Sequence, residues 1–105
     1  MAGTLLSVGV VVCSATLSVA LVTAGAASVF SQRLAGAADA AALAAADAAS
    51  GLVGGAPCVR AGEVAAASGA QVIACDLDGL VATITVAATF VRLPATASAR
   101  AGPPP

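Results

Sequence analysis

The sequence predicts an α+β protein: a long N-terminal transmembrane helix that continues outside the membrane, then a short helix packed on a small antiparallel sheet. Three observations predict it. No charged residue precedes Arg33, alanine dominates the stretch that follows, and a turn-forming Asp78-Gly79 pair separates two strand-like segments. We therefore divide the chain into a helix (1–50), a Gly-rich linker (51–57), a small domain (58–101) and a disordered tail (102–105).

The first 32 residues are uncharged and mostly aliphatic or small. A hydrocarbon core about 30 Å thick needs roughly 20 such residues in a helix, so this stretch is long enough to cross a membrane. Nothing interrupts the helix at Gln32-Arg33-Leu34, which leads into alanine, the strongest helix former. We expect one helix from Leu5 to Ser50, about 70 Å long at 1.5 Å per residue, ending at Gly51.

A cleaved signal peptide is the rival interpretation of this segment, with Ala24-Gly25-Ala26 as its small-residue cleavage site. No basic residue precedes the apolar run, and the run is longer than the usual 7–15 residues or so of a signal peptide. We therefore favour an uncleaved anchor. Arg33, taken alone, would place the C-terminal side in the cytoplasm; the cysteines discussed below argue more strongly for the opposite orientation.

Small and polar residues follow one line along the expected helix. At about 100° per residue, six of them fall within roughly 20° of that line. They are Ser7, Ser14, Ser18, Gly25, Gln32 and Gly36. Small residues on one face let membrane helices approach closely, so the line is a candidate packing face. Chance scatter in a chain this rich in small residues is the alternative.

The C-terminal part predicts one short helix and a hairpin. Pro57 stands where a helix begins and Gly69 where it ends. Gln71–Leu77 and Leu80–Val91 flank Asp78-Gly79, a pair suited to a type I′ turn. Alternation in the second strand places one set of residues on the buried face: Leu80, Ala82, Ile84, Val86, Ala88 and Phe90. Pro94 is expected to end that strand, and Ala95–Ala101 to form a third, edge strand.

Cys58 and Cys75 are expected to form a disulfide. Cys58 lies on the apolar face of the short helix, and Cys75 shares a strand face with Ile73 and Leu77. A bridge would close a loop of about 18 residues and contribute around 3 kcal/mol in the chain-entropy model. Two buried free thiols are the alternative. A disulfide requires an oxidising compartment, which places the domain outside the cytoplasm. Cys13, inside the apolar run, is most simply a small hydrophobic residue.

Composition argues against an enzyme and against nucleic-acid binding. The chain lacks His, Lys, Trp and Tyr, so it offers neither the usual general bases nor a basic, aromatic surface. Asp76 and Asp78 are explained as residues of the hairpin turn. We expect no catalytic, cofactor-binding or metal-binding residues, no cofactor, and no small-molecule substrate.

The residues Gln32–Ala46 resemble the membrane-exit helix of Tad (Flp) pilus-assembly proteins of the TadE/TadG-like group. Pro57-Cys58 and the segment Cys75-Asp76-Leu77-Asp78-Gly79 resemble the short actinobacterial members encoded beside a helicase and a secretion locus. The resemblance implies a pilin-like fold and a structural role as a minor pseudopilin. Its partners would be other pilin-like subunits or pilus and secretion assembly proteins. The chain would be a single-pass protein of the cytoplasmic membrane with an extracytoplasmic domain, which can pass to a cell-surface pilus.

In a prepilin of this type, Gly3 would be the cleavage point and Thr4 the new N-terminus. The sequence departs from the prepilin pattern in two respects: no basic leader precedes Gly3, and Val8 stands at the fifth mature position, where a Glu is usual. Two other functions therefore stay open. One is a membrane-tethered adaptor that does not polymerise and binds another envelope protein. The other is a small secreted domain released by cleavage near Ala26.

Overall fold

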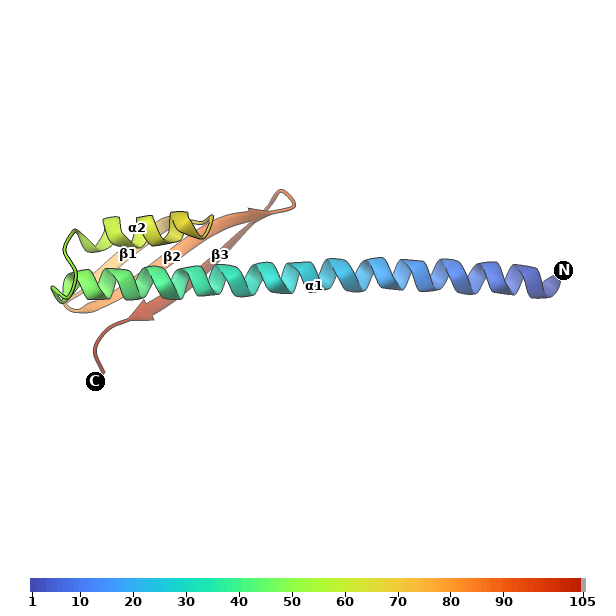
Figure 1. Ribbon diagram of the computed structural model, residues 1–105, viewed down its shortest axis with the longest axis horizontal. Helices are drawn as coiled ribbons and strands as arrows, with labels where there is room; N and C mark the ends of the chain where they lie inside the picture. Colours follow the sequence, from blue (N-terminus) through green and yellow to red (C-terminus); the bar gives the residue numbers. More distant parts are fainter. Residues whose placement is uncertain (105) are drawn as a thin grey trace.

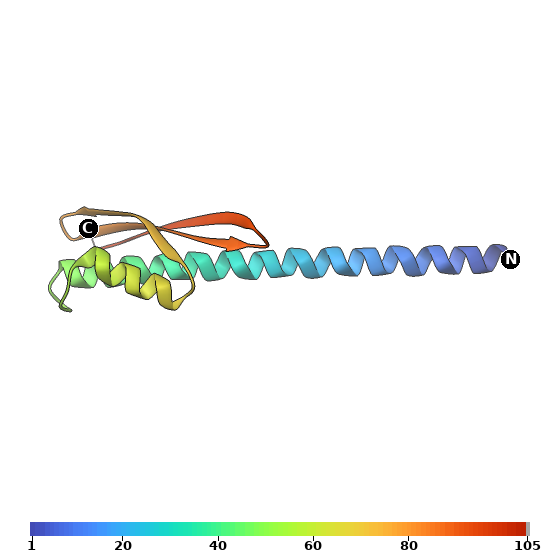
Figure 2. The same ribbon diagram turned by 90° about the horizontal axis from the view of Figure 1, so that it is seen from above.

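The computed structural model describes residues 1–104 and has an α+β fold, as the sequence predicts. The elements are α1 (Ala2–Ala49), α2 (Pro57–Ala67), β1 (Gln71–Asp78), β2 (Val81–Phe90) and β3 (Leu93–Ala101). The molecule measures 75 × 28 × 17 Å. Figures 1 and 2 show α1 as a straight rod, with the other elements gathered around its C-terminal half. We call residues 50–104 the head.

Both helices end at the glycines expected to stop them. After α1, Gly51 has a φ of +80°, the Gly51 N–H donates to Ala48 O (3.2 Å) and the Leu52 N–H to Asp47 O (2.9 Å). After α2, Gly69 has a φ of +76°, and the N–H groups of Gly69 and Ala70 donate in the same way to Ala66 and Ala65. These are two Schellman motifs, which satisfy carbonyls that the helix end would otherwise leave without partners.

The head and the C-terminal half of α1 form two layers. The two helices, α1 and α2, lie on one face of a three-stranded antiparallel sheet in the order β1-β2-β3. α1 packs against α2, β2 and β3, whereas α2 has few contacts with β1. Ala82, Ile84 and Val86 of β2 are fully buried, which confirms the predicted inner face of that strand. Opposite them, β3 presents Ala97 and its alanine neighbours to the helix layer. Small side chains on both layers let the backbones approach closely.

The β1–β2 turn differs from the prediction by one residue. Asp78 pairs with Val81, so the loop is Gly79-Leu80, and only Gly79 has a positive φ, of +60°. A positive φ at the first loop position alone is the requirement of a type II′ turn, not of type I′. The paired positions shift by two, and because the side-chain period of a strand is also two, Cys75, Ala82 and Ile84 keep their predicted face. Leu80, predicted on the buried face, instead lies in the loop and is 46% exposed. Leu77 accordingly lies opposite Ala82 rather than Leu80.

A β-bulge in β1 changes the place of Ile73. The register shifts between Val72 and Ala74, so that Val72 pairs with Val86 and Cys75 with Ile84. The extra residue of a bulge is left out of the alternation. Ile73, predicted to share the inner face with Cys75, is instead 58% exposed, and Val72 takes the inner position. The prediction for Ile73 was wrong because regular alternation does not reveal a bulge.

The β2–β3 connection also differs from expectation. β2 ends at Phe90, β3 begins at Leu93, and the intervening Val91 and Arg92 have positive φ values of 50° and 66°. Pro94 does not end the sheet; it lies within β3, paired with Thr89. β3 is an edge strand, where a residue without an N–H is tolerated.

Gly102, just after β3, lies close to the first hairpin. A Cβ added there would come within 2.9 Å of a Val81 methyl carbon, so a larger residue would force a shift. Pro105 lies outside the described residues, and the disorder expected for 102–105 stays a prediction.

Candidate packing interface on the long helix

One face of α1 is covered by the head. The buried residues of this helix recur with helical spacing: Leu34, Ala37, Ala38, Ala41, Ala42, Ala45 and Ala46. All but one are alanine, and they face β2, β3 and α2. The alanine-rich half of α1 therefore packs against the chain's own head.

The opposite face of α1 is free. All six residues of the predicted packing line are exposed, and a Cβ added at Gly25 or Gly36 would meet nothing within 4 Å. At about 100° per residue, the line lies roughly 155° around the helix from the buried alanine stripe. Leu43, 57% exposed, continues the line towards the end of the helix, where it borders an open hollow with Leu80 of the head. The structure thus leaves uncovered the face on which the small and polar residues gather.

Four hydroxyl groups in the apolar half of α1 are hydrogen-bonded within the helix. Ser7 Oγ donates to Gly3 O, and Ser18 Oγ donates to Ser14 O, each at 2.9 Å. Thr16 and Thr23 donate to the carbonyls four residues earlier in the same way. These bonds remove the need for an outside partner, so the hydroxyls can enter an apolar medium or a helix interface at little cost.

α1 is, among the described residues, the one helix long and apolar enough to cross a membrane, as judged by length and composition. None of the apolar window of α1 is buried, although a signal sequence would have the same properties. Gly3 and Thr4, the candidate processing residues, lie in the first turn of this helix and are exposed. A side chain at Gly3 would meet nothing within 4 Å.

The expected disulfide joins Cys58 to Cys75, with 6.0 Å between their Cα atoms. Its position differs from expectation in one respect: Cys58 is exposed and Cys75 half-buried, so the bridge lies at the rim of the core. The fully buried residues of α2 are Ala61 and Ala65, which face α1. The bridge is thus the main link between α2 and β1. Cys13 is a free, exposed thiol on the apolar half of α1.

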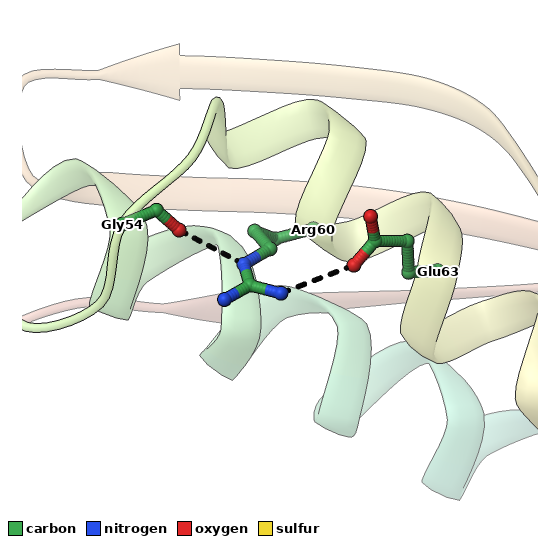
Figure 3. A network of polar contacts seen from close by, with 3 residues as sticks. All are labelled: Gly54, Arg60 and Glu63. Carbon is green, nitrogen blue, oxygen red and sulfur yellow. Dashed lines mark hydrogen bonds and ion pairs between the residues drawn. The ribbon is translucent and has the colours of Figure 1, made fainter.

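A small polar network fixes the linker between the helices (Figure 3). Arg60 Nε donates to the carbonyl of Gly54 (2.9 Å), and Arg60 Nη1 contacts Glu63 Oε2 (3.2 Å). Gly55, with a φ of +106°, lies beneath the Arg60 side chain. Both charged side chains are more than 40% exposed, so the ion pair contributes little to stability. The network has the geometry of a loop clamp rather than of a reacting centre.

No cluster of three potential metal ligands and no buried polar side chain occurs within residues 1–104. Asp76 and Asp78 both lie on β1, and neither is buried. Two open hollows form between α1 and the head. One, of about 230 Å³, adjoins Leu43 and Leu80; the other, of about 580 Å³, adjoins Phe30 and Phe90.

The contact between Phe30 and Phe90 was not foreseen from the sequence. Their rings stack with centroids 5.0 Å apart, and they are the only two aromatic residues of the chain. Phe90 was placed on the inner face by alternation, but nothing in the pattern indicated which residue of the long helix it would meet. The rarity of aromatic residues was the one available signal.

Comparisons with protein-family models, curated proteins and solved structures found no match to the chain. The sequence and structure alone therefore carry the functional inference. They give a long apolar N-terminal helix, suited to a membrane anchor or a signal sequence, and an α+β head closed by a disulfide.

Proposed function

We propose that the chain is a structural, membrane-anchored pseudopilin of a Tad/Flp-type pilus or secretion apparatus, which acts by helix packing. The N-terminal half of α1 lies in the cytoplasmic membrane, and the head lies outside the cytoplasm. The observation that supports this best is the division of α1 into two faces. The head covers one face of the C-terminal part of α1, from Leu34 to Ala46, and the opposite side carries a line of small and polar residues from Ser7 to Gly36.

A helix built in this way is suited to pack against similar helices. Gly25 and Gly36 have open space where a Cβ would stand, so another helix can approach the backbone there. Within a membrane the hydrophobic effect does not drive helices together, because lipid tails are as apolar as the helix surface. Association of the helices therefore depends on such close packing. The Cys58–Cys75 bridge is consistent with folding of the head in an oxidising compartment.

A membrane-tethered adaptor is the second candidate, and the residue at position 8 favours it. Val8 is exposed at the position where a prepilin carries Glu. An adaptor would keep its N-terminal residues and use the head to bind another envelope protein. Release as a secreted domain, by cleavage near Ala26, would separate the head from more than half of α1, yet would leave the buried alanine stripe intact.

The intact mass of the native chain distinguishes these functions. It is measured separately in the membrane, in material sheared from the cell surface, and in the culture medium. A chain that begins at Thr4 in the sheared fraction is expected for a pseudopilin. A chain that begins at Met1 and stays in the membrane would support the adaptor instead. A product in the medium that begins near Ala27 would overturn membrane anchoring altogether.

A further inference from the structure

The β2–β3 turn exposes apolar side chains in a costly conformation. Val91 is 76% exposed and Leu93 67% exposed. Val91 and Arg92 both have a positive φ, which glycine or asparagine adopts far more readily. A β-branched residue in this region is a backbone outlier that carries strain. Exposure of valine and leucine to water at such a turn does not stabilise the fold.

The turn lies beside the apolar half of α1. Phe90, the last residue of β2, stacks on Phe30, three positions before Arg33 on the helix. Figures 1 and 2 show the β2–β3 turn at the end of the head that faces the bare part of α1. Phe90 and residues of α1 such as Val22, Val29 and Arg33 line an open hollow of about 580 Å³. The residue that precedes the turn therefore adjoins the apolar part of the helix.

The position along α1 corresponds to a membrane boundary. From Leu5 to Phe30 the helix rises about 38 Å, at 1.5 Å per residue. The hydrocarbon core is about 30 Å thick, and about 40–45 Å with the headgroup layers. If the apolar half of α1 crosses the bilayer, Phe30 and the β2–β3 turn are at the level of the headgroups.

Charge is arranged to suit an anionic lipid surface. Arg33 and Arg92 lie at this end of the head, and within the described residues neither forms an ion pair. The opposite end of the sheet, about 30 Å away along the ten residues of β2, carries Asp76 and Asp78 together with Arg100, which flanks Thr83 on the other side from Asp76. The head therefore presents exposed apolar side chains and arginines to one side, and charges of both signs to the other.

We infer that the β2–β3 turn is a membrane-binding element that seats the head on the lipid surface. Val91 and Leu93 enter the boundary between headgroups and acyl chains, and Arg33 and Arg92 bind the phosphates of anionic lipids. The inference rests on the membrane anchoring proposed above. Burial of the exposed turn residues in lipid offsets the cost of the turn's backbone conformation.

Tryptophan fluorescence tests this inference, because the chain has no tryptophan of its own. Leu93→Trp places a probe at the β2–β3 turn, and Leu80→Trp places a matched, exposed probe at the β1–β2 turn. The full chain is reconstituted in phosphatidylcholine vesicles with or without one quarter phosphatidylglycerol. Quenching by lipids with a spin label near the headgroup is then measured. We expect quenching at position 93 to exceed that at position 80 several-fold, and to fall when Arg92→Gln is added in anionic vesicles.

Equal quenching at the two positions, in protein that floats with the vesicles, would overturn the inference and leave membrane anchoring intact. Protein that fails to float with vesicles would overturn the anchoring itself. A second copy of the chain is the other possible occupant of the turn. An emission shift at position 93 that disappears on dilution with lipid would identify that occupant and also overturn the inference. Quenching that is independent of the lipid-to-protein ratio supports lipid contact.

Discussion

Ile84 and Val86 are the largest side chains that the head buries completely. Most of the other buried residues are alanines, each of which removes little apolar surface from water. The stability of a head with so small a core depends on packing and also on features that lower the conformational entropy of the unfolded chain. The Cys58–Cys75 bridge is the strongest of these, because it ties α2 to a strand with which α2 has few other contacts.

Loss of the bridge is therefore expected to destabilise the head markedly. Cys58→Ser and Cys75→Ser should each lower the free energy of unfolding by about 3 kcal/mol, and the double variant by the same amount, because one link is lost in every case. Amide hydrogen exchange in β2, measured on the full chain in detergent, reports this change. Reductant should bring the wild type to the level of the variants, whereas Cys13→Ala should leave exchange unchanged. If the wild type and the cysteine variants showed equal protection from amide exchange under oxidising conditions, the bridge would not stabilise the head.

The helices of this chain end where their glycines require it. Gly51 and Gly69 occupy the left-handed position of a Schellman motif, and Pro57 begins α2. Each signal acts locally, through a backbone angle that one residue type adopts most easily, so the sequence alone predicts it. By the same reasoning, a glycine inside α2 and the glycine that follows α2 should affect stability in opposite directions when each is replaced by alanine.

Gly69→Ala and Gly62→Ala are such a pair of substitutions. Gly69 has a φ of +76°, so alanine there should destabilise the head by about 1–2 kcal/mol. Gly62 lies inside α2 with nothing within 4 Å of an added Cβ, so alanine should stabilise by about 0.5–1 kcal/mol. Exchange protection in β2 should change in opposite directions. Changes of the same sign would mean that α2 does not end at Gly69.

The strand connections were less predictable than the helix ends, for a physical reason. Asp78-Gly79 suits a type I′ loop, but Gly79-Leu80 suits type II′ equally, and the register decides between them through contacts distant in sequence. The bulge that exposes Ile73 leaves no mark in the alternation. Pro94 excludes a central strand but allows an edge strand. That β3 lies at an edge is known only from the strand order of the sheet.

At the scale of the whole molecule, the sequence predicted a projecting alanine-rich helix but not which of its faces the head would cover. Alanine surrounds α1 on nearly all sides between Ala35 and Ala49, so the pattern carries little directional information. Leu34 and Phe30 lie on the side of the head, but Leu43 lies on the opposite side, so the large residues gave no single direction. The six residues of the free line fell within a narrow arc, and the structure leaves that arc uncovered.

Gly36→Leu tests the free face at the point where the head and the bare helix meet. An added side chain at Gly36 meets nothing within 4 Å, and leucine is a better helix former than glycine, so the variant should fold and form its disulfide normally. If copies or related subunits pack on this face, the side chain should prevent their close approach. We expect the amount of chain in the sheared surface fraction to fall at least tenfold relative to the membrane fraction. Ala35→Leu is the matched control, because Ala35 is also exposed but lies about 100° around the helix. An equal effect of the two variants, or none from either, would mean that this face does not carry the assembly.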